Sequence, residues 1–356
     1  MAGFDRPALP KLLNQPIMRK SILIFAALMA FTALLAQDYT LVWSDEFNDP
    51  ALNTDIWNIE VNNSGCGNAE LEYYSERGVS MGVEPNSGEH CLILTARKEE
   101  WGSGSGLRHF TSGRINSSQK VYFTHGIVEA QILIPSTANG LWPAFWMMGN
   151  DHKTNSWPRC GEIDIMEMGN ANGIKNGTQD RYFNGAAHWG FYNKNNAYPN
   201  YGVPSTNSYS LQDGQFHLFT LVWDESNLTM YLDRDKYPNV QPYYKMGIES
   251  TDGDWATGNY FHKPFFILFN LAVGGNFPNI KTVEGITALA NEERSMYVNY
   301  VRVYQKEKNI VAPASTGLDD APFPAVEATK LIINGRLLIL RDGTYYDITG
   351  HEITNP

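Results

Sequence analysis

Short apolar runs separated by Gly, Asn, Pro and Ser dominate the chain between residues 39 and 304. Each clear run alternates polar and apolar residues or is rich in β-branched and aromatic ones, which is typical of strands. The runs are Cys91–Ala96, Gly126–Ile134, Gly161–Met168, Phe216–Trp223, Leu228–Leu232, Phe265–Val273 and Tyr297–Tyr304. Helical periodicity is weak throughout and predicts one short helix, over Ile286–Ser295. Many short strands with frequent turn signals predict an all-β fold, an antiparallel β-sandwich.

One predicted strand carries three acids among aliphatic residues. Residues 161–169 read Gly-Glu-Ile-Asp-Ile-Met-Glu-Met-Gly. Side chains at i and i+2 share a face of a strand, so Glu162 and Asp164 point the same way. Glu167 departs from this alternation by one residue. A bulge at Ile165–Met166 would return Glu167 to the acidic face, which predicts a row of three carboxyl groups.

A row of carboxyl groups is unfavourable unless it has a use, because neighbouring like charges disfavour joint ionisation. Clustered acids of this kind mark functional sites, and two carboxyl groups across a scissile bond are what glycoside hydrolysis requires. The alternative is a solvated strand edge with scattered acids. The aromatic stretch at residues 140–149 argues against that alternative. Trp142 and Trp146 lie four apart on a predicted strand, share a face and are candidate sugar platforms, with core packing as the other interpretation.

Net charge limits the classes of partner. The formal charge is −11, and the first 36 residues are themselves basic, so the remainder is more acidic still. An acidic surface repels phosphate backbones, so we expect no nucleic-acid partner. A neutral polymer needs no electrostatic attraction and is compatible with this charge.

The N-terminal residues 1–36 have the pattern of an extension followed by a signal peptide. Met18-Arg19-Lys20 precedes an uncharged apolar run from Ile22 to Ala36, which is too short to span a bilayer comfortably. We expect cleavage near Ala36 and export to the periplasm, the cell surface or the medium, with no stable membrane span. The alternative is a buried N-terminal helix.

The chain contains three cysteines, Cys66, Cys91 and Cys160. Their spacing does not match a zinc site. Export permits one disulfide, and the sequence does not choose among the three pairings.

The predicted domains are a sandwich over residues 37–305, a linker over 306–329 and a short tail over 330–356. The linker is rich in Ala, Pro and Ser. In the tail, Asn334-Gly335 and Asp342-Gly343 lie between strand-like runs, which is a strong hairpin signal. A piece of this size is too small to fold stably alone.

The segment Glu162–Glu167 resembles the signature of family 16 of the glycoside hydrolases. It matches the branch with the extra residue, which includes laminarinases, agarases and carrageenases. Four further stretches are similar to those of laminarinases, and the resemblance covers about residues 39–305. They are Gly67–Tyr74, Thr111–Ile115, Gly140–Trp146 and Asn270–Asn276. The tail from Lys330 resembles C-terminal tails of exported proteins of Gram-negative polysaccharide degraders, some of which direct secretion; the alternative is a strand pair docked on the sandwich.

The resemblance implies a jelly-roll β-sandwich of two antiparallel sheets with a long concave substrate cleft. It further implies endo-acting hydrolysis of β-glucan with retention. By position, Glu162 matches the nucleophile, Asp164 the assisting carboxylate and Glu167 the general acid/base. Repulsion from the other two acids is expected to raise the pKa of Glu167.

The resemblance also suggests substrate contacts beyond the acids. His188 and Trp189 are similar to a pair that lines the cleft, and a structural role is the alternative for them. Candidate contacts to sugar hydroxyls are Asn68, Glu72, Arg114 and Asn276.

The chain departs from the family pattern in two places. Phe277 stands where the family usually has Trp, which removes an indole N–H donor. No cofactor is expected to be required. A structural calcium would use Glu46 and Asn299, where Asn299 supplies an oxygen without the charge of the usual acid.

The resulting functional hypothesis is a monomeric endo-β-glucanase that cleaves internal β-1,3 linkages. Mixed β-1,3/1,4 glucan is its second expected substrate. One alternative is a galactan hydrolase of the same branch, similar to agarases. Another is a glycan-binding sandwich without catalysis, which the presence of both glutamates disfavours. Transglycosylation is the remaining alternative.

Overall fold

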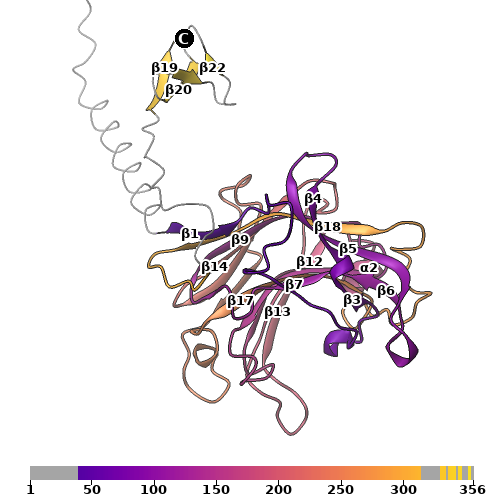
Figure 1. Ribbon diagram of the computed structural model, residues 1–356. Coiled ribbons are helices and arrows are strands. Elements are labelled where there is room, and N and C mark those ends of the chain that lie inside the picture. Colours follow the sequence, from indigo (N-terminus) through magenta and orange to yellow (C-terminus); the bar gives the residue numbers. More distant parts are fainter. Residues whose placement is uncertain (1–38, 314–328, 334–335, 342–343, 347–351, 354–356) are drawn as a thin grey trace, which may run out of the picture. The chain divides into compact units, whose positions relative to one another are not determined.

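The computed structural model describes residues 39–313, 329–333, 336–341, 344–346 and 352–353 (Figure 1). The predicted signal peptide lies outside the described residues. Contacts divide the chain into two compact units, residues 1–313 and 314–356. The first unit carries two large sheets, and the predicted all-β sandwich is confirmed.

A ten-stranded sheet has the order β16-β15-β14-β9-β18-β5-β6-β3, with β1 beside β18 and β4 beside β5. Neighbours are antiparallel except for β3 and β6, which are parallel. Its strands are β1 (Thr40–Asp45), β3 (Tyr73–Tyr74), β4 (Val79–Val83), β5 (His90–Trp101), β6 (Arg108–Ser112), β9 (Gly126–Leu133), β14 (His217–Trp223), β15 (Asn227–Leu232), β16 (Tyr244–Gly247) and β18 (Arg294–Gln305).

An eight-stranded sheet has the order β13-β12-β11-β10-β17-β7-β2, with β8 beside β17. All of its pairings are antiparallel. Its strands are β2 (Asn58–Ile59), β7 (Arg114–Asn116), β8 (Tyr122–Phe123), β10 (Leu141–Gly149), β11 (Glu162–Met168), β12 (Tyr182–His188), β13 (Asn200–Thr206) and β17 (Phe265–Val273). The acidic strand β11 therefore lies inside this sheet, between β10 and β12.

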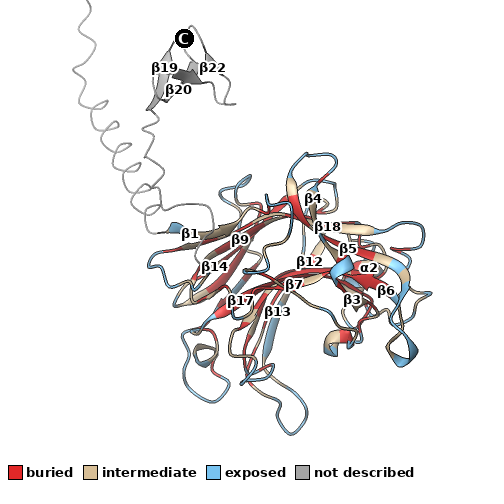
Figure 2. Ribbon diagram, in the orientation of Figure 1, coloured by how far each residue is buried: buried red, intermediate tan, exposed pale blue. Residues whose placement is uncertain are grey.

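The core forms where the inner faces of the two sheets meet, and buried residues follow the strands of both (Figure 2). Alternate residues of each strand supply it, as the period of two requires. On β11 these are Ile163 and Ile165, both fully buried, while Phe145 and Phe269 stack with ring centroids 4.8 Å apart. Burying one such side chain contributes about 1.5–3 kcal/mol. This packing fixes which face of β11 is turned away from the core.

All seven predicted runs overlap strands, but the helix predicted over Ile286–Ser295 is wrong. Ile286, Ala288 and Leu289 are buried, which is the pattern that suggested a helix. The backbone N–H groups of Thr287 and Ala288 instead bond to the carbonyl of Asn139. That distant partner holds the start of the segment in a turn instead of a helix.

Helical structure in the described residues is short. The one α-helix there is α2 (Ala171–Asn176), which ends at Gly177 with φ 66°. Four 3₁₀ turns occupy Gly65–Gly67, Glu76–Gly78, Gly104–Gly106 and Thr257–Asn259. No helix within the described part of the chain is long and apolar enough to cross a membrane. The three cysteines are all free thiols, so the permitted disulfide is not formed.

The sandwich unit includes residues that were predicted as the start of the linker. Val311 still forms a bridge with Tyr122, so the sandwich unit includes residues 306–313. The second unit contains β19 (Thr329–Ile333), β20 (Arg336–Arg341), β21 (Thr344–Tyr346) and β22 (Glu352–Ile353), antiparallel in that order. Strands β19 and β20 pair antiparallel, and the predicted Asn334-Gly335 turn lies outside the described residues.

Candidate active site

A bulge on β11 brings three acids to one face. Against β10 the register jumps past Ile165, which has no partner there, and against β12 it shifts between Asp164 and Glu167. The predicted bulge is therefore confirmed. Directly opposed residues of neighbouring strands share a face. The partners of Glu162, Asp164 and Glu167 on β10 are Met148, Trp146 and Ala144.

The alternation along β10 independently places these partners together. Residues 142, 144, 146 and 148 are separated by two, and residues 141, 143, 145, 147 and 149 between them are buried. Trp142 and Trp146 thus share the face of the three acids, as their spacing predicted. This face of the eight-stranded sheet combines aromatic surface with carboxyl groups.

The bulge has a dedicated support from the ten-stranded side. The hydroxyl of Tyr243 donates a hydrogen bond to the carbonyl of Ile165. The residue of β12 opposite the bulge is Gly185, and a Cβ there would lie 3.0 Å from Cε2 of Tyr243 and 2.9 Å from Sδ of Met230. Glycine at this position leaves room for the Tyr243 ring beneath the bulge.

The three acids hold protons more strongly than free carboxyl groups. Burial is the main cause, and it raises the pKa of Glu162 and of Asp164 to about 8 each. The pKa of Glu167 is raised well above its usual range, first by burial and then by the charges of Asp164 and Glu162. Repulsion was predicted as the cause; burial is the larger one. A low-dielectric site disfavours the charged form, so protons are retained near neutral pH.

Glu162 differs from Glu167 in the groups that favour its anion. His188, Arg114 and a hydrogen bond from Trp157 all lower the pKa of Glu162 against the effect of burial. Arg114 and Trp157 are not among the main causes that shift the pKa of Glu167, and both neighbouring acids raise it. Of the two glutamates, Glu162 is therefore the more readily ionised, and Glu167 keeps its proton to higher pH.

His188, the last residue of β12, pairs with Glu162 of β11 and contacts two of the acids. Its Nε2 is 3.4 Å from Oδ2 of Asp164 and 3.9 Å from Oε1 of Glu162. Its Nδ1 is 3.1 Å from the hydroxyl of Tyr198, which fixes the ring from the other side. One ligand atom each from Glu162, Asp164 and His188 lies within 4.8 Å of the others. His188 therefore belongs to the acidic site.

Trp142 contacts the general-acid candidate directly. Its indole Nε1 donates a hydrogen bond of 3.1 Å to Oε1 of Glu167. Its ring stacks on Phe277, with centroids 4.8 Å apart and planes 13° apart. Phe277, which replaces the usual tryptophan, thus extends the aromatic surface next to Glu167.

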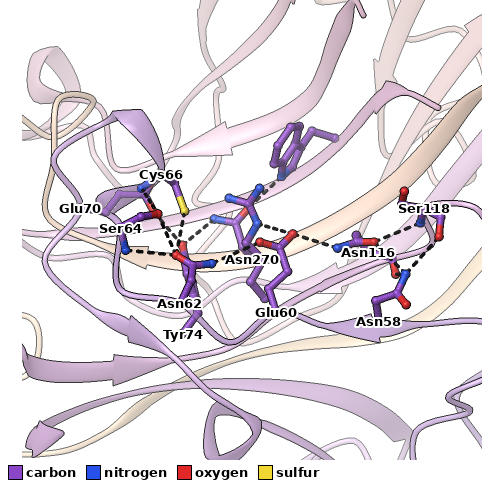
Figure 3. A network of polar contacts seen from close by, with 12 residues as sticks. Asn58, Glu60, Asn62, Ser64, Cys66, Glu70, Tyr74, Asn116, Ser118 and Asn270 are labelled. Carbon is purple, nitrogen blue, oxygen red and sulfur yellow. Dashed lines mark hydrogen bonds and ion pairs between the residues drawn. The ribbon is translucent and has the colours of Figure 1, made fainter. Parts of the chain in front are cut away.

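A polar network that includes Asn270, Tyr74 and Glu60 (Figure 3) anchors Trp146. Its Nε1 donates to Oδ1 of Asn270 at 2.7 Å, and Asn270 in turn contacts the hydroxyl of Tyr74 at 3.4 Å. The guanidinium of Arg114 lies 5.0 Å from the centre of the Trp146 ring and pairs with Glu60 at 2.9 Å. The predicted contact residue Arg114 is thus next to the tryptophan platform.

Glu72 does not reach the outer face of the sheet. Its side chain is 1% exposed, and its Oε2 accepts the backbone N–H of Val273 at 2.7 Å. Burial and the neighbouring Glu70 raise the pKa of Glu72 well above the usual range. The prediction that Glu72 contacts sugar is replaced by a structural interpretation, in which it holds the end of β17.

Asn68 and Asn276 lie on two loops that are joined by their backbones. The N–H of Asn276 donates to the carbonyl of Asn68 at 2.8 Å. Gly275, with φ 101°, permits this approach, because a Cβ there would lie 2.9 Å from that carbonyl oxygen. Asn276 is exposed, whereas the Asn68 amide contacts Glu70 at 3.3 Å. A direct contact of either residue with sugar stays a prediction.

Trp189 is part of the core rather than of the acidic face. It is 8% exposed, its Nε1 donates to the carbonyl of Trp255 at 2.7 Å, and its ring packs on Phe261. Adjacent residues of an extended segment point to opposite faces, so His188 and Trp189 cannot both face the acids. The prediction of a His–Trp pair lining the site is wrong for Trp189.

Glu46 and Asn299 do not form the expected calcium site. The carboxylate of Glu46 binds the guanidinium of Arg302 through two contacts of 2.9 and 2.7 Å. The amide nitrogen of Asn299 donates to Oε1 of Gln131 at 2.7 Å. Calcium needs several oxygen ligands directed at one point. A carboxylate neutralised by arginine does not fit that requirement, so these residues do not fit a calcium ion.

Sequence reasoning missed four residues of the site: Trp157, Tyr198, Tyr243 and Asn270. Trp157 lies five residues before Glu162, and this closeness to the acid row was a usable signal. Its ring, 37% exposed, lies against Tyr198 with centroids 4.9 Å apart. Tyr198 and Tyr243 are placed by tertiary packing that no local pattern signals, and Asn270 lies in a stretch that was singled out without a role for this residue.

The family model described as Glycosyl hydrolases family 16 matches residues 73–251. A glucan endo-1,3-beta-glucosidase of Cryptopygus antarcticus is 34% identical over 259 residues, covering 71% of this chain and 87% of that protein. Glucan endo-1,3-beta-glucosidase A1 of Niallia circulans is 31% identical over 282 residues. That match covers 75% of this chain but only 38% of the longer relative.

Among solved structures, a family 16 enzyme from the mixed-linkage glucan locus of Bacteroides ovatus, in complex with a product, is similar. It has a TM-score of 0.63 and 37% sequence identity, and the match covers 74% of this chain and all of that one. The likeness thus extends through the whole sandwich of that enzyme.

Proposed function

Because the chain belongs to glycosyl hydrolases family 16, we propose that it is an exported endo-β-glucanase that cleaves internal β-1,3 linkages. Mixed β-1,3/1,4 glucan is the second proposed substrate, supported by the similar Bacteroides ovatus enzyme. The observation that carries the proposal is the β11 bulge, which places two glutamates and an aspartate on one face beside Trp142 and Trp146. Export rests on the N-terminal sequence pattern.

The proposed mechanism is double displacement with retention. In the first step, the carboxylate of Glu162 attacks the anomeric carbon while Glu167 donates its proton to the departing glycosidic oxygen. A covalent glycosyl-enzyme forms, and the shortened chain leaves with a new hydroxyl. In the second step, Glu167 removes a proton from water, the water attacks the anomeric carbon, and Glu162 is released.

The electrostatics support this division of roles. Burial and two neighbouring acids keep the proton on Glu167, as an acid catalyst requires. When Glu162 is esterified its charge disappears, which lowers the pKa of Glu167 and makes it a better base for the second step. Asp164, which lies in the same row with Oδ2 3.4 Å from Nε2 of His188, would influence the charge around Glu162.

The aromatic surface supports a neutral sugar as the substrate. Pyranose faces present C–H groups that pack on rings, and Trp142, Trp146 and Phe277 offer rings next to the acids. Arg114 is a basic residue that lies against the Trp146 ring, and it is already paired with Glu60. A sulfated galactan would call for unpaired basic groups, so the observed pairing favours glucan over sulfated galactan.

A parallel reducing-sugar assay tests the proposal on laminarin, barley mixed-linkage glucan, lichenan and agarose. We expect release from laminarin, weaker or equal release from the mixed-linkage glucans, and none from agarose. NMR of the earliest products should show the β-anomer. Activity on agarose alone, or immediate α-product, would contradict the proposed substrate or the proposed mechanism respectively.

A further inference from the structure

A cavity lies on the side of the eight-stranded sheet opposite the acids. It has a volume of about 420 Å³, within the ~300–1,000 Å³ of ligand-binding pockets. Phe183 on β12 and Ser205 on β13 pair with one another and line it. The next residue, Asn184, pairs with Glu167 on the acidic face, so Phe183 and Ser205 point to the opposite one. The cavity is therefore separate from the proposed active site.

Aromatic rings form one part of the cavity wall. Tyr237 is 51% exposed, and its ring centroid lies 6.0 Å from that of Tyr209 with planes 40° apart. Tyr209 is held in place, because its hydroxyl donates to Asp233 at 2.8 Å and its ring stacks on His217. One ring is thus fixed and the other is open to solvent, so a ligand face could pack on them at little cost in ordering.

Neutral polar groups form another part of the wall. Asn207, Ser208 and Gln241 line the cavity, and no charged residue appears among the described residues that do. Their amide and hydroxyl groups can both donate and accept hydrogen bonds, which suits a ligand that carries hydroxyl groups and no charge.

We propose that this cavity is a second, non-catalytic binding site for a short segment of neutral glucan. A pyranose offers apolar C–H faces to the tyrosine rings and hydroxyl groups to the amides, and it carries no charge, in agreement with the lining. The choice of glucan as the ligand rests on the proposed function. A site outside the catalytic face would raise the local concentration of polymer without contacting the bond that is cut.

Affinity electrophoresis of the full chain tests binding without requiring catalysis. Three proteins run in native gels with and without laminarin: Glu162→Gln, Glu162→Gln/Tyr237→Ala and Glu162→Gln/Tyr237→Phe. We expect laminarin to retard the alanine variant about threefold less, or weaker still. Linking two binding sites can raise apparent affinity by ~100-fold, so a threefold effect is a modest one. The phenylalanine variant keeps the ring and should keep the retardation. Equal retardation of all three would overturn the proposal.

Hydrolysis in the unmodified background separates the two hypotheses. Tyr237→Ala should cleave laminarihexaose at the wild-type rate, because a short substrate gains nothing from a second site. On insoluble β-1,3-glucan its rate should fall by about threefold or more. Equal rates of wild type and variant on the insoluble polymer would overturn the second site. Failure of the wild type to cleave any glucan would instead overturn the proposed function, and the electrophoresis would still decide whether the cavity binds glucan.

Discussion

The hydroxyl of Tyr243 donates a hydrogen bond to the backbone carbonyl of Ile165, the one residue of β11 that the bulge leaves without a partner on β10. The bulge sets the side on which Glu167 emerges, so this bond supports the placement of the proposed acid from behind. Tyr243 also packs edge-on against Phe183, with centroids 4.9 Å apart, which restrains the ring. Tyr243 is thus a positioning residue for the acid row, on the side of the sheet away from the acids.

Replacing Tyr243 by Phe should lower turnover without weakening substrate binding. The carbonyl of Ile165 would lose its partner at a cost of about 1–3 kcal/mol, which corresponds to a Tm lower by about 2–10 °C. We expect kcat to fall by about tenfold with KM unchanged, less than the ~100-fold of a 1 Å misplacement. Steady-state kinetics on laminarin and thermal unfolding measure both effects.

Tyr244→Phe is the matched control for that change. Tyr244 is the buried neighbour in sequence, and its hydroxyl contacts the carbonyl of Tyr201 at 3.3 Å rather than the bulge. It should lose stability but keep kcat. An equal fall in kcat for both variants would show that general destabilisation, not positioning, explains the effect of Tyr243→Phe.

The two glutamates should respond differently to substitution and to the leaving group. Glu162→Gln removes the nucleophile and should abolish turnover of every substrate. Glu167→Gln removes acid catalysis, worth about 10²–10⁴-fold, which a dinitrophenyl leaving group does not need. We therefore expect Glu167→Gln to lose laminarin hydrolysis but to keep a burst of dinitrophenol from an aryl β-glucoside of laminaribiose. A burst from Glu162→Gln, and none from Glu167→Gln, would reverse the assignments.

The acid row could be predicted from sequence because its chemistry lies within six consecutive residues. The positions of Glu162 and Asp164 follow from strand alternation, and the single break at Glu167 predicts a bulge. The strands succeeded for the same reason: runs such as Phe265–Val273 carry their own β signal. Local sequence pattern was sufficient to predict these features because they do not depend on partners that are distant in the chain.

The rest of the site depends on partners that are distant in the chain. Glu72 was expected at the substrate, yet it is buried by a bond to Val273, 201 residues away. Trp189 was expected to line the site, yet it is buried and its indole donates to the carbonyl of Trp255, 66 residues away. No pattern around Glu72 or Trp189 encodes these contacts, because they arise only when β12, β17 and the connecting loops have packed.

Calcium should have no measurable effect on stability through Glu46. Arg302 already neutralises its carboxylate, and a partly exposed pair of this kind contributes about 0–1 kcal/mol. We expect EDTA and added CaCl₂ to leave the Tm of the wild type unchanged within about 1 °C in scanning calorimetry. Glu46→Gln serves as the control, with a small loss of stability that calcium does not alter. A rise in Tm with calcium that Glu46→Gln abolishes would restore the predicted site.

The stability of the wild type should fall with increasing pH across the range where Glu162 ionises. Its pKa is raised from 4.5 to about 8 in the folded chain, so the folded state binds more protons than the unfolded state between these values. Stability is therefore fully present below about pH 4.5 and is lost as pH rises towards 8. Glu162→Gln, which resembles the neutral acid, should match the wild type at pH 4.5 and exceed its Tm by about 2–4 °C or more at pH 8.5. An equal Tm for both proteins at pH 8.5 would contradict the raised pKa.

The indole N–H of Trp142 should hold down the pKa of Glu167 and so limit activity at alkaline pH. It donates to the Glu167 carboxylate at 3.1 Å, which favours the charged form. Trp142→Phe removes that donor, so Glu167 should keep its proton to higher pH and the alkaline limb of kcat/KM should move up by about one pH unit. Trp146→Phe is the matched control, because its indole donates to Asn270 and not to an acid. Both variants lose ring area, and both are expected to raise KM. An alkaline limb that stays in place for Trp142→Phe, or that moves equally for Trp146→Phe, would show that Glu167 is not the group that titrates there.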